Sequence, residues 1–166
     1  MAKKCNKVAK FAPIVAAVLG VVAVVMIFVA AVVFPMDYLD DVTFTGLQVT
    51  FGYAETTDVF GSTVTTEVLK FSFMNLLPYL MVIGAIVLSV LAFLGKGNKF
   101  FAIIAAVLFI VAGVLFFLTV AFTIDANGEG LGEGYVLGAG PIVAGICSIL
   151  AGLVAAAPTV MGKVCK

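Results

Sequence analysis

Residues 73–99 read FMNLLPYLMVIGAIVLSVLAFLGKGNK, and residues 100–124 read FFAIIAAVLFIVAGVLFFLTVAFTI. Each of the two apolar runs exceeds the ~20 residues that a helix needs to cross the hydrocarbon core of a bilayer. The loop between them, Gly95–Lys99, is only long enough to reverse the chain. This stretch therefore predicts two antiparallel transmembrane helices that are neighbours in one bundle.

Two further apolar runs lie on either side of this pair. The four predicted spans are 11–34, 73–94, 100–124 and 137–162. The chain is 64% hydrophobic and 11% charged, whereas a soluble domain carries about 25% charged residues. We therefore predict one membrane domain over residues 1–166, an all-α bundle of four transmembrane helices with a small extracellular β-hairpin or sheet.

The charged residues are sorted by position along the chain. Eight lysines lie at the two ends and in the central loop: Lys3, Lys4, Lys7, Lys10, Lys96, Lys99, Lys163 and Lys166. All nine acids lie in the other two loops: Asp37, Asp40, Asp41, Glu55, Asp58, Glu67, Asp125, Glu129 and Glu133. Only Lys70 breaks this order. The positive-inside rule then places both termini in the cytoplasm and both acidic loops outside. The membrane we expect is a bacterial inner membrane or a plasma membrane, on general grounds and not from this rule.

The first acidic loop, residues 36–72, is long enough to have a fold of its own. Apolar and polar residues alternate over Val42–Tyr53 and, less regularly, over Thr63–Phe73, which is the period of a β-strand. The residues expected in this outer β-element are Leu47, Val49, Phe51, Tyr53, Leu69 and Phe71. A lone hairpin is marginally stable in water, so we expect it to pack on the bundle or on a neighbouring subunit. The second acidic loop, 125–136, is glycine-rich and is predicted to be a flexible connection.

Small residues repeat every four positions along the fourth span. They are Gly140, Ala144, Ser148, Gly152 and Ala156, and the first span has a shorter version at Ala12, Ala16 and Gly20. Such faces let helix backbones approach closely in lipid. Two interpretations stay open: packing inside the chain's own bundle, and an interface between subunits.

The second acidic loop also resembles the first half of a calcium-binding loop. Asp125, Asn127 and Glu129 occupy positions one, three and five, and Gly130 occupies position six. Position twelve is Val136, where a bidentate glutamate is expected. Ca²⁺ is therefore a weak candidate ligand, set against a solvated acidic surface that only enforces topology.

The sequence offers little for catalysis or for a cofactor. The chain has no histidine and no arginine, and the predicted spans contain no Asp, Glu or Lys. Intramembrane ionisable residues mark proton relays and ion pathways, so a proton-coupled transporter or an enzyme is not expected. Nothing resembles a basic patch for nucleic acid. Cys147 is interpreted as a small packing residue. Whether Cys5 and Cys165 carry a lipid stays open.

Four spans, cytoplasmic termini, a β-rich first outer loop and a short second one resemble the plan of claudins and tetraspan proteins. The claudin first loop carries Gly-Leu-Trp followed by two cysteines; here Gly46-Leu47 is followed by Gln48, and the loop has no cysteine. The resemblance implies a protein that assembles laterally, and sometimes across membranes, into junctions or scaffolds. It implies no functional residue.

Three functions follow as hypotheses. The first is a structural membrane protein that forms homo-oligomers through small-residue helix faces and the outer β-element, whose open strand edges are templates for pairing. The second is a pore or permeation component with an acidic outer mouth and a polar path from Ser89, Thr119 and Ser148. The third is an accessory subunit of another membrane complex, whose lysine-bearing tails touch anionic lipid.

Overall fold

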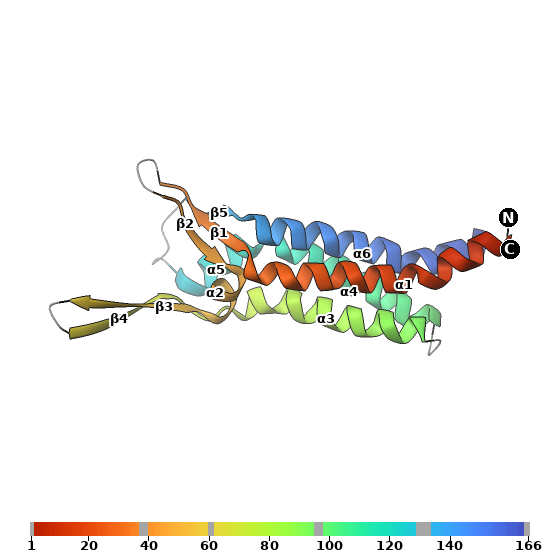
Figure 1. Cartoon of the computed structure of the whole chain (residues 1–166), viewed down its shortest axis with the longest axis horizontal. Helices are drawn as coiled ribbons and strands as arrows, with labels where there is room; N and C mark the ends of the chain where they lie inside the picture. The colour runs from red at the N-terminus through yellow and green to blue at the C-terminus, as the bar shows by residue number, and fades with distance from the viewer. Residues whose placement is uncertain (1, 37–39, 60–61, 95–97, 129–133, 165–166) are drawn as a thin grey trace.

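The computed structural model describes residues 2–36, 40–59, 62–94, 98–128 and 134–164. Four long helices run side by side and form the body of the molecule (Figure 1). They are α1 (Ala2–Val25), α3 (Phe73–Phe93), α4 (Asn98–Phe116) and α6 (Ala139–Val164). Helix α1 begins and α6 ends at one end of the bundle, which we call the terminus end; the strands lie at the other, which we call the cap end (Figure 1).

Each long helix contains a stretch that is long and apolar enough to cross a membrane, so the four predicted apolar helices are confirmed. These stretches are Phe11–Phe28, Phe73–Phe93, Lys99–Phe116 and Ala139–Thr159. Large apolar side chains cover the outside of the bundle: Phe100, Val107 and Leu153 are 67%, 54% and 58% exposed. A surface of this kind is stable against lipid or against other protein.

The interior of the bundle is built mostly from alanine. Helices α1 and α4 each pack against both α3 and α6. Ala16, Ala105 and Ala144 are fully buried at these contacts, and the rings of Phe109 and Phe116 fill the space between them. Small side chains bring the helix backbones close together, which increases van der Waals contact where lipid supplies no hydrophobic drive.

The first apolar run is not helical to its end. Helix α1 ends at Val25, a 3₁₀ turn (η1) covers Met26–Phe28, and strand β1 covers Ala30–Phe34. The prediction of one helix over 11–34 was therefore wrong over its last residues. Periodicity does not separate a short buried strand from the end of a helix, and the β-branched and aromatic residues at 32–34 suit a pleated sheet.

The third apolar run is also divided. Helix α4 ends at Phe116, and a shorter helix, α5 (Thr119–Asn127), follows after two residues. The hydroxyl of Thr119 donates to the backbone oxygen of Phe116 at 2.8 Å, a local bond of the kind that competes with the helix ladder. The predicted helix over 100–124 is therefore two helices. The second and fourth predicted spans agree with α3 and α6 within two residues.

Strand β1 is the middle strand of a three-stranded antiparallel sheet at the cap end, in the order β2-β1-β5. Its neighbours are β2 (Val42–Thr45) and β5 (Val136–Leu137). The register pairs Val33 with Thr43 on one side and with Val136 on the other. The sheet therefore joins the end of the first span to the beginning of the last, and the second acidic loop is more than a flexible connection because β5 belongs to it.

Helix α2 (Gly46–Phe51) replaces part of the predicted strand over 42–53. Thr45 caps it: the Gln48 backbone N–H donates to Thr45 Oγ1 at 3.4 Å, and the Thr45 N–H donates to Gln48 Oε1 at 2.8 Å. This reciprocal capping box stabilises a helix start, which the alternation of apolar residues alone does not report. The predicted strand positions Leu47, Val49 and Phe51 are thus helical.

A β-hairpin does form in the first acidic loop; its first strand lies later than predicted, and its second strand overlaps the predicted one over residues 63–69. Strand β3 (Tyr53–Val59) pairs antiparallel with β4 (Ser62–Leu69). Figure 1 shows the hairpin extending beyond the cap end, along the long axis of the bundle. The expected packing on the rest of the chain is seen at the base of the hairpin, and packing of its outer part on a neighbouring subunit stays a prediction.

Candidate functional site

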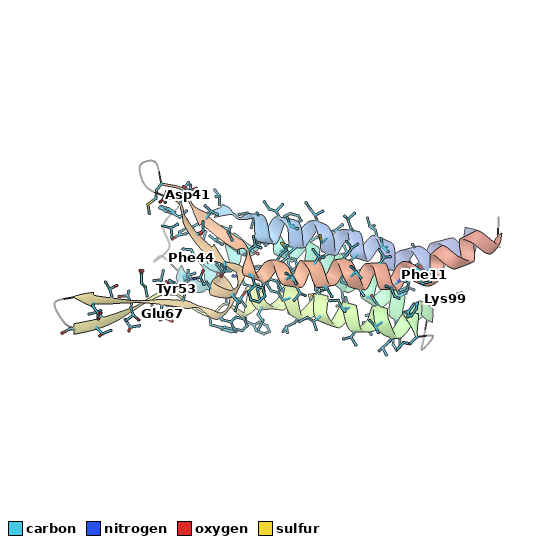
Figure 2. All side chains as sticks on the ribbon, viewed as in Figure 1. Phe11, Asp41, Phe44, Tyr53, Glu67 and Lys99 are labelled. Carbon is cyan, nitrogen blue, oxygen red and sulfur yellow. The ribbon has the colours of Figure 1, made fainter. Side chains whose placement is uncertain are left out.

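The projecting hairpin is the largest polar feature at the cap end. Residues 54–58 and 62–67 are exposed along both strands (Figure 2). Within the part of the chain that the structure describes, β3 and β4 pair only with each other. Each strand therefore presents one open edge of backbone N–H and C=O groups, and an open edge is a template for pairing with another chain.

The two faces of the hairpin follow from its register. Thr56 lies opposite Thr65, with 3.4 Å between their hydroxyl oxygens, and Asp58 lies opposite Thr63 on that same face. On the other face Glu55 lies opposite Thr66 and Thr57 opposite Val64. The hairpin carries three acids, Glu55, Asp58 and Glu67, and no base. It is thus a threonine-rich, acidic surface with few apolar side chains.

The base of the hairpin is held in a small hydrophobic core beneath the cap. Leu69 and Val49 are 1% and 2% exposed, and they pack with Phe44 and with the half-buried Tyr53. The rings of Phe44 and Tyr53 have centroids 6.3 Å apart. This core holds the base of the hairpin in place. It includes Val49, Tyr53 and Leu69, which are among the residues predicted for the outer β-element. Leu47 is half-buried, whereas Phe51 and Phe71 are exposed.

A buried polar cluster lies between the cap and the bundle. Asn75, in the first turn of α3, is 2% exposed; its Nδ2 donates to the backbone oxygen of Val49 at 3.2 Å and to Thr123 Oγ1 at 2.9 Å. The Thr123 hydroxyl in turn donates to the backbone oxygen of Thr119 at 2.8 Å. One amide therefore ties α2, α3 and α5 together. The sequence shows Asn75 near the end of a span, but not its partners.

The segment before α3 adds further ties. Ser72 caps α3, accepting from the Asn75 N–H at 3.4 Å, and its own N–H donates to the backbone oxygen of Thr50 at 3.0 Å. The Lys70 N–H donates to Asn127 Oδ1 at 2.8 Å, and Asn127 Nδ2 donates to the backbone oxygen of Thr123 at 2.7 Å. The ends of α2, β4 and α5 are thus fixed relative to the start of α3. Ser72 and Asn75 stand three residues apart, which is the one sequence signal for this N-cap.

The calcium candidates do not form a chelating loop among the described residues. Asp125 and Asn127 lie in the last turns of helix α5, and both polar atoms of the Asn127 side chain are already used. Glu129 lies outside the described residues. No group of three or more metal-ligating side chains occurs where the structure is described. The helical backbone explains this result, because an EF-type site needs a loop from its first position.

The small-residue face of the fourth span lies inside the bundle. A side chain at Gly140 would stand 3.0 Å from the backbone oxygens of Ala30 and Met26, and one at Gly152 would stand 2.9 Å from that of Ala106. Ala144 and Ser148 are fully buried, and Ala156 packs half-buried on the same core. Of the two interpretations, packing within the chain is the one that accounts for these contacts.

The shorter face of the first span has the same role. Ala12 and Ala16 are 7% and 0% exposed. A side chain at Gly20 would stand 2.7 Å from Ile86 Cγ1 and 2.8 Å from Phe109 Cε1, which belong to α3 and α4. These residues are therefore used in packing α1 on the rest of the bundle.

The polar residues considered for a permeation path are dispersed. Ser89 lies on α3, Ser148 on α6 and Thr119 at the start of α5, and α3 and α6 are not among the closely packed helix pairs. The Thr119 hydroxyl is used within the chain. The hydroxyls of Ser89 and Ser148 are buried without a hydrogen-bond partner among the described residues. Among the described residues, no hydrogen bond joins any two of these three side chains.

Tyr135 reinforces the sheet at the cap end. Its ring packs on Phe34 of β1 with centroids 5.0 Å apart. Partial burial raises the pKa of the Tyr135 phenol above its ordinary value. The pair therefore adds an aromatic contact between β1 and the segment that enters β5.

Comparison with known protein families, with curated proteins and with solved structures gives no match to this chain.

Proposed function

We propose that this is an integral membrane protein that crosses the bilayer four times, with the terminus end in the cytoplasm and the cap end outside. Four helices of sufficient length and the apolar outer surface of the bundle support the crossing. The sorting of lysines and acids supports the orientation. The proposed arrangement is that of claudins and tetraspan proteins.

The proposed role is structural and non-enzymatic: copies of the protein assemble side by side in one membrane through the edges of the hairpin. The observation that carries this proposal is an exposed two-stranded hairpin with both edges open. A two-stranded hairpin is marginal by itself, and added strands stabilise it. The small-residue helix faces pack inside the bundle. We therefore propose the open edges of the hairpin, and not these helix faces, as the surface through which copies assemble.

The direction of the hairpin decides how copies pair. Both strands run along the long axis of the bundle (Figure 1). On the proposed membrane crossing, this axis is close to the membrane normal. In copies that share a membrane, β4 of one runs antiparallel to β3 of the next, and their edges meet at the same height. Repeating this contact gives a continuous antiparallel sheet above the membrane. Two like strands pair antiparallel only when the second copy is inverted, as it is in an opposing membrane.

The charges of the hairpin are compatible with side-by-side pairing. At equal height, residues of neighbouring copies meet in the register of the hairpin itself. Glu55 of one copy then lies opposite Thr66 of the next, and Glu67 lies opposite Ala54. No acid faces another acid directly across the interface, so the like-charge repulsion that destabilises cross-strand pairs is avoided.

Disulfide crosslinking between differently tagged copies tests the proposal. The parent is a variant in which Cys5, Cys147 and Cys165 are alanine. Copies with Thr56→Cys and copies with Thr65→Cys are produced together and oxidised in native membranes. We expect mixed dimers, because the proposed register places the two positions directly opposite each other on one face, and opposed antiparallel residues have Cα atoms about 4.5–5.5 Å apart, within the range of a disulfide. The matched control replaces Thr56→Cys by Thr57→Cys, which lies on the opposite face and should not crosslink.

Two results would contradict this arrangement. Dimers from Thr65→Cys copies alone, in the absence of a partner cysteine at position 56, would indicate pairing of like strands. No crosslinking at either pair, together with a stoichiometric second protein after mild solubilisation, would instead indicate an accessory subunit of another complex.

A further inference from the structure

A patch of large apolar side chains lies at the foot of the hairpin, outside both hydrophobic cores. It consists of Phe51, Phe71, Phe73 and Met74, which are 53%, 53%, 56% and 49% exposed. The rings of Phe51 and Phe71 have centroids 6.4 Å apart. We call these four residues the aromatic foot. Among the described side chains of β3 and β4 beyond Tyr53, none is aromatic, so the foot marks an abrupt change of surface.

The foot is held firmly at the end of a candidate span. The apolar stretch of α3 begins at Phe73 itself. The Ser72 N–H donates to the backbone oxygen of Thr50, which keeps the end of α2 against the start of α3. Gly52 joins α2 to β3 with φ of 88°, and a side chain there would stand 2.8 Å from the backbone oxygen of Leu69. The rings therefore have a fixed height relative to the bundle.

Lys70 stands beside this patch. It is the single basic residue between Lys10 and Lys96, and it immediately precedes Phe71. Its side chain is exposed, and it makes no ion pair with any residue that the structure describes. A cation next to aromatic rings at the end of a span matches the border of a bilayer, where rings lie at headgroup level and lysine reaches lipid phosphate.

We propose that the aromatic foot and Lys70 form a lipid-binding anchor that lies in the headgroup region of the outer leaflet, with the Lys70 ammonium on a phospholipid phosphate. The foot is continuous with the lipid-facing side of α3, and its cation complements the anionic phosphate. The continuity with the apolar outer side of α3 is the feature that favours phospholipid over a second copy, whose hairpin is polar and acidic. The inference rests on the proposed membrane crossing and is independent of the assembly through hairpin edges.

The chain contains no tryptophan, so a single introduced indole gives an unmixed fluorescence signal. Three variants are reconstituted in phosphatidylcholine vesicles that contain lipids brominated either near the headgroup or deep in the acyl chains. Phe71→Trp reports the foot, Val64→Trp reports the hairpin, and Val87→Trp reports an exposed position within the α3 span. All three replace exposed side chains, so the fold should tolerate them.

The expected pattern is specific to depth. Phe71→Trp should be quenched most by the shallow bromines, Val87→Trp most by the deep ones, and Val64→Trp by neither. Adding Lys70→Glu to Phe71→Trp should reduce the shallow quenching, because the carboxylate repels the lipid phosphates around a ring whose height the bundle sets. Lys70→Arg, which keeps the charge, should preserve it.

The outcomes separate the two proposals. If Val87→Trp is quenched and Phe71→Trp is not, the anchor is wrong and the membrane crossing stands. Unquenched but blue-shifted emission from Phe71→Trp also overturns the anchor, because protein and not lipid then covers the foot. If Val87→Trp is quenched by neither lipid, the crossing itself fails. Shallow quenching that is unchanged by Lys70→Glu overturns the role of Lys70.

Discussion

Asn75 is the residue on which the junction between cap and bundle depends. Its side-chain amide supplies both donors to other segments: one to the backbone of α2 and one to the hydroxyl of Thr123 on α5. Buried backbone oxygens need a donor, because no water replaces it at low cost. Asn75 therefore connects α3 to α2 and to α5 by hydrogen bonds. The residues next to it in the sequence do not predict this role.

The Asn75→Asp variant should be less stable by about 1–3 kcal/mol at neutral pH, since a carboxylate accepts hydrogen bonds and donates none. Lowering the pH should restore part of the stability, because a protonated carboxyl regains one donor. Reversible unfolding in mixed detergent micelles measures the change. Thr57→Ala, an exposed change in the hairpin, is the control and should leave the unfolding curve unchanged. Equal stability of Asn75→Asp and the parent at neutral pH would refute this role.

At the scale of the elements, α4 and α6 approach closely at three glycines. A side chain at Gly113 would stand 3.0 Å from the backbone oxygen of Gly145, and one at Gly145 would stand 3.0 Å from that of Gly113. One at Gly152 would stand 2.6 Å from Ile110 Cγ1. At this contact, the backbone of α4 touches the backbone of α6. An added methyl group therefore cannot be accommodated by moving a side chain, and a whole helix would have to shift.

The Gly152→Ala variant should therefore lose about 1–3 kcal/mol of stability through overpacking. Gly84→Ala on α3 is the matched control, because the nearest atom to its added methyl group, Leu108 Cδ1, is 4.0 Å away. The melting temperature in detergent, followed by circular dichroism, compares the two. A Gly152→Ala protein that melts with the parent would show that α4 and α6 are held less closely than described.

The sequence predicted the long elements better than the short ones. Composition and length are sufficient to predict the four apolar helices, because a run of ~20 apolar residues is itself a strong signal for a long apolar helix. The ends of these runs depend on tertiary partners: residues 30–34 form a strand because β2 and β5 flank them, and residues 46–51 form a helix because Thr45 and Gln48 cap it. Only the capping pair has a local signal in the sequence.

The candidate site was predicted in kind but not in place. An open hairpin in the first acidic loop was expected, and the structure has one, shifted toward residues 53–69. The alternation over Val42–Tyr53 predicted one strand, but residues 46–51 form the short helix α2. Over so few residues, the spacing of apolar side chains does not distinguish a strand from a short helix. The junction of Asn75 with Thr123 joins residues far apart in the chain, and no sequence period reports such a contact.

At the scale of the whole molecule, the hairpin and the bundle are separable. The described side chains of 54–58 and 62–67 contribute to neither hydrophobic core, whereas Tyr53, Val68 and Leu69 pack at the base. Replacing 54–67 by a short Asn-Gly turn should therefore keep the helical circular dichroism and the melting temperature. On the proposed function, the same change should reduce the particle mass in mild detergent to that of a monomer, measured by light scattering.

Two results would count against this expectation. An unfolded variant would mean that the hairpin contributes to the stability of the bundle. A folded variant of unchanged oligomeric mass would place the assembly surface elsewhere on the molecule. The Thr57→Ala variant, with an intact hairpin, serves as the reference for both readings.

The central position of β1 has a consequence for how the chain is made. Val33 pairs with Val136, so one edge of β1 stays unpaired until β5 leaves the ribosome, about 100 residues later. At ~5–20 residues per second, this interval lasts about 5–20 s. A nascent chain that already contains the first three long helices therefore has an incomplete sheet, which is completed only when β5 is synthesised, just before α6. The yield of folded protein should therefore depend on the pace of translation.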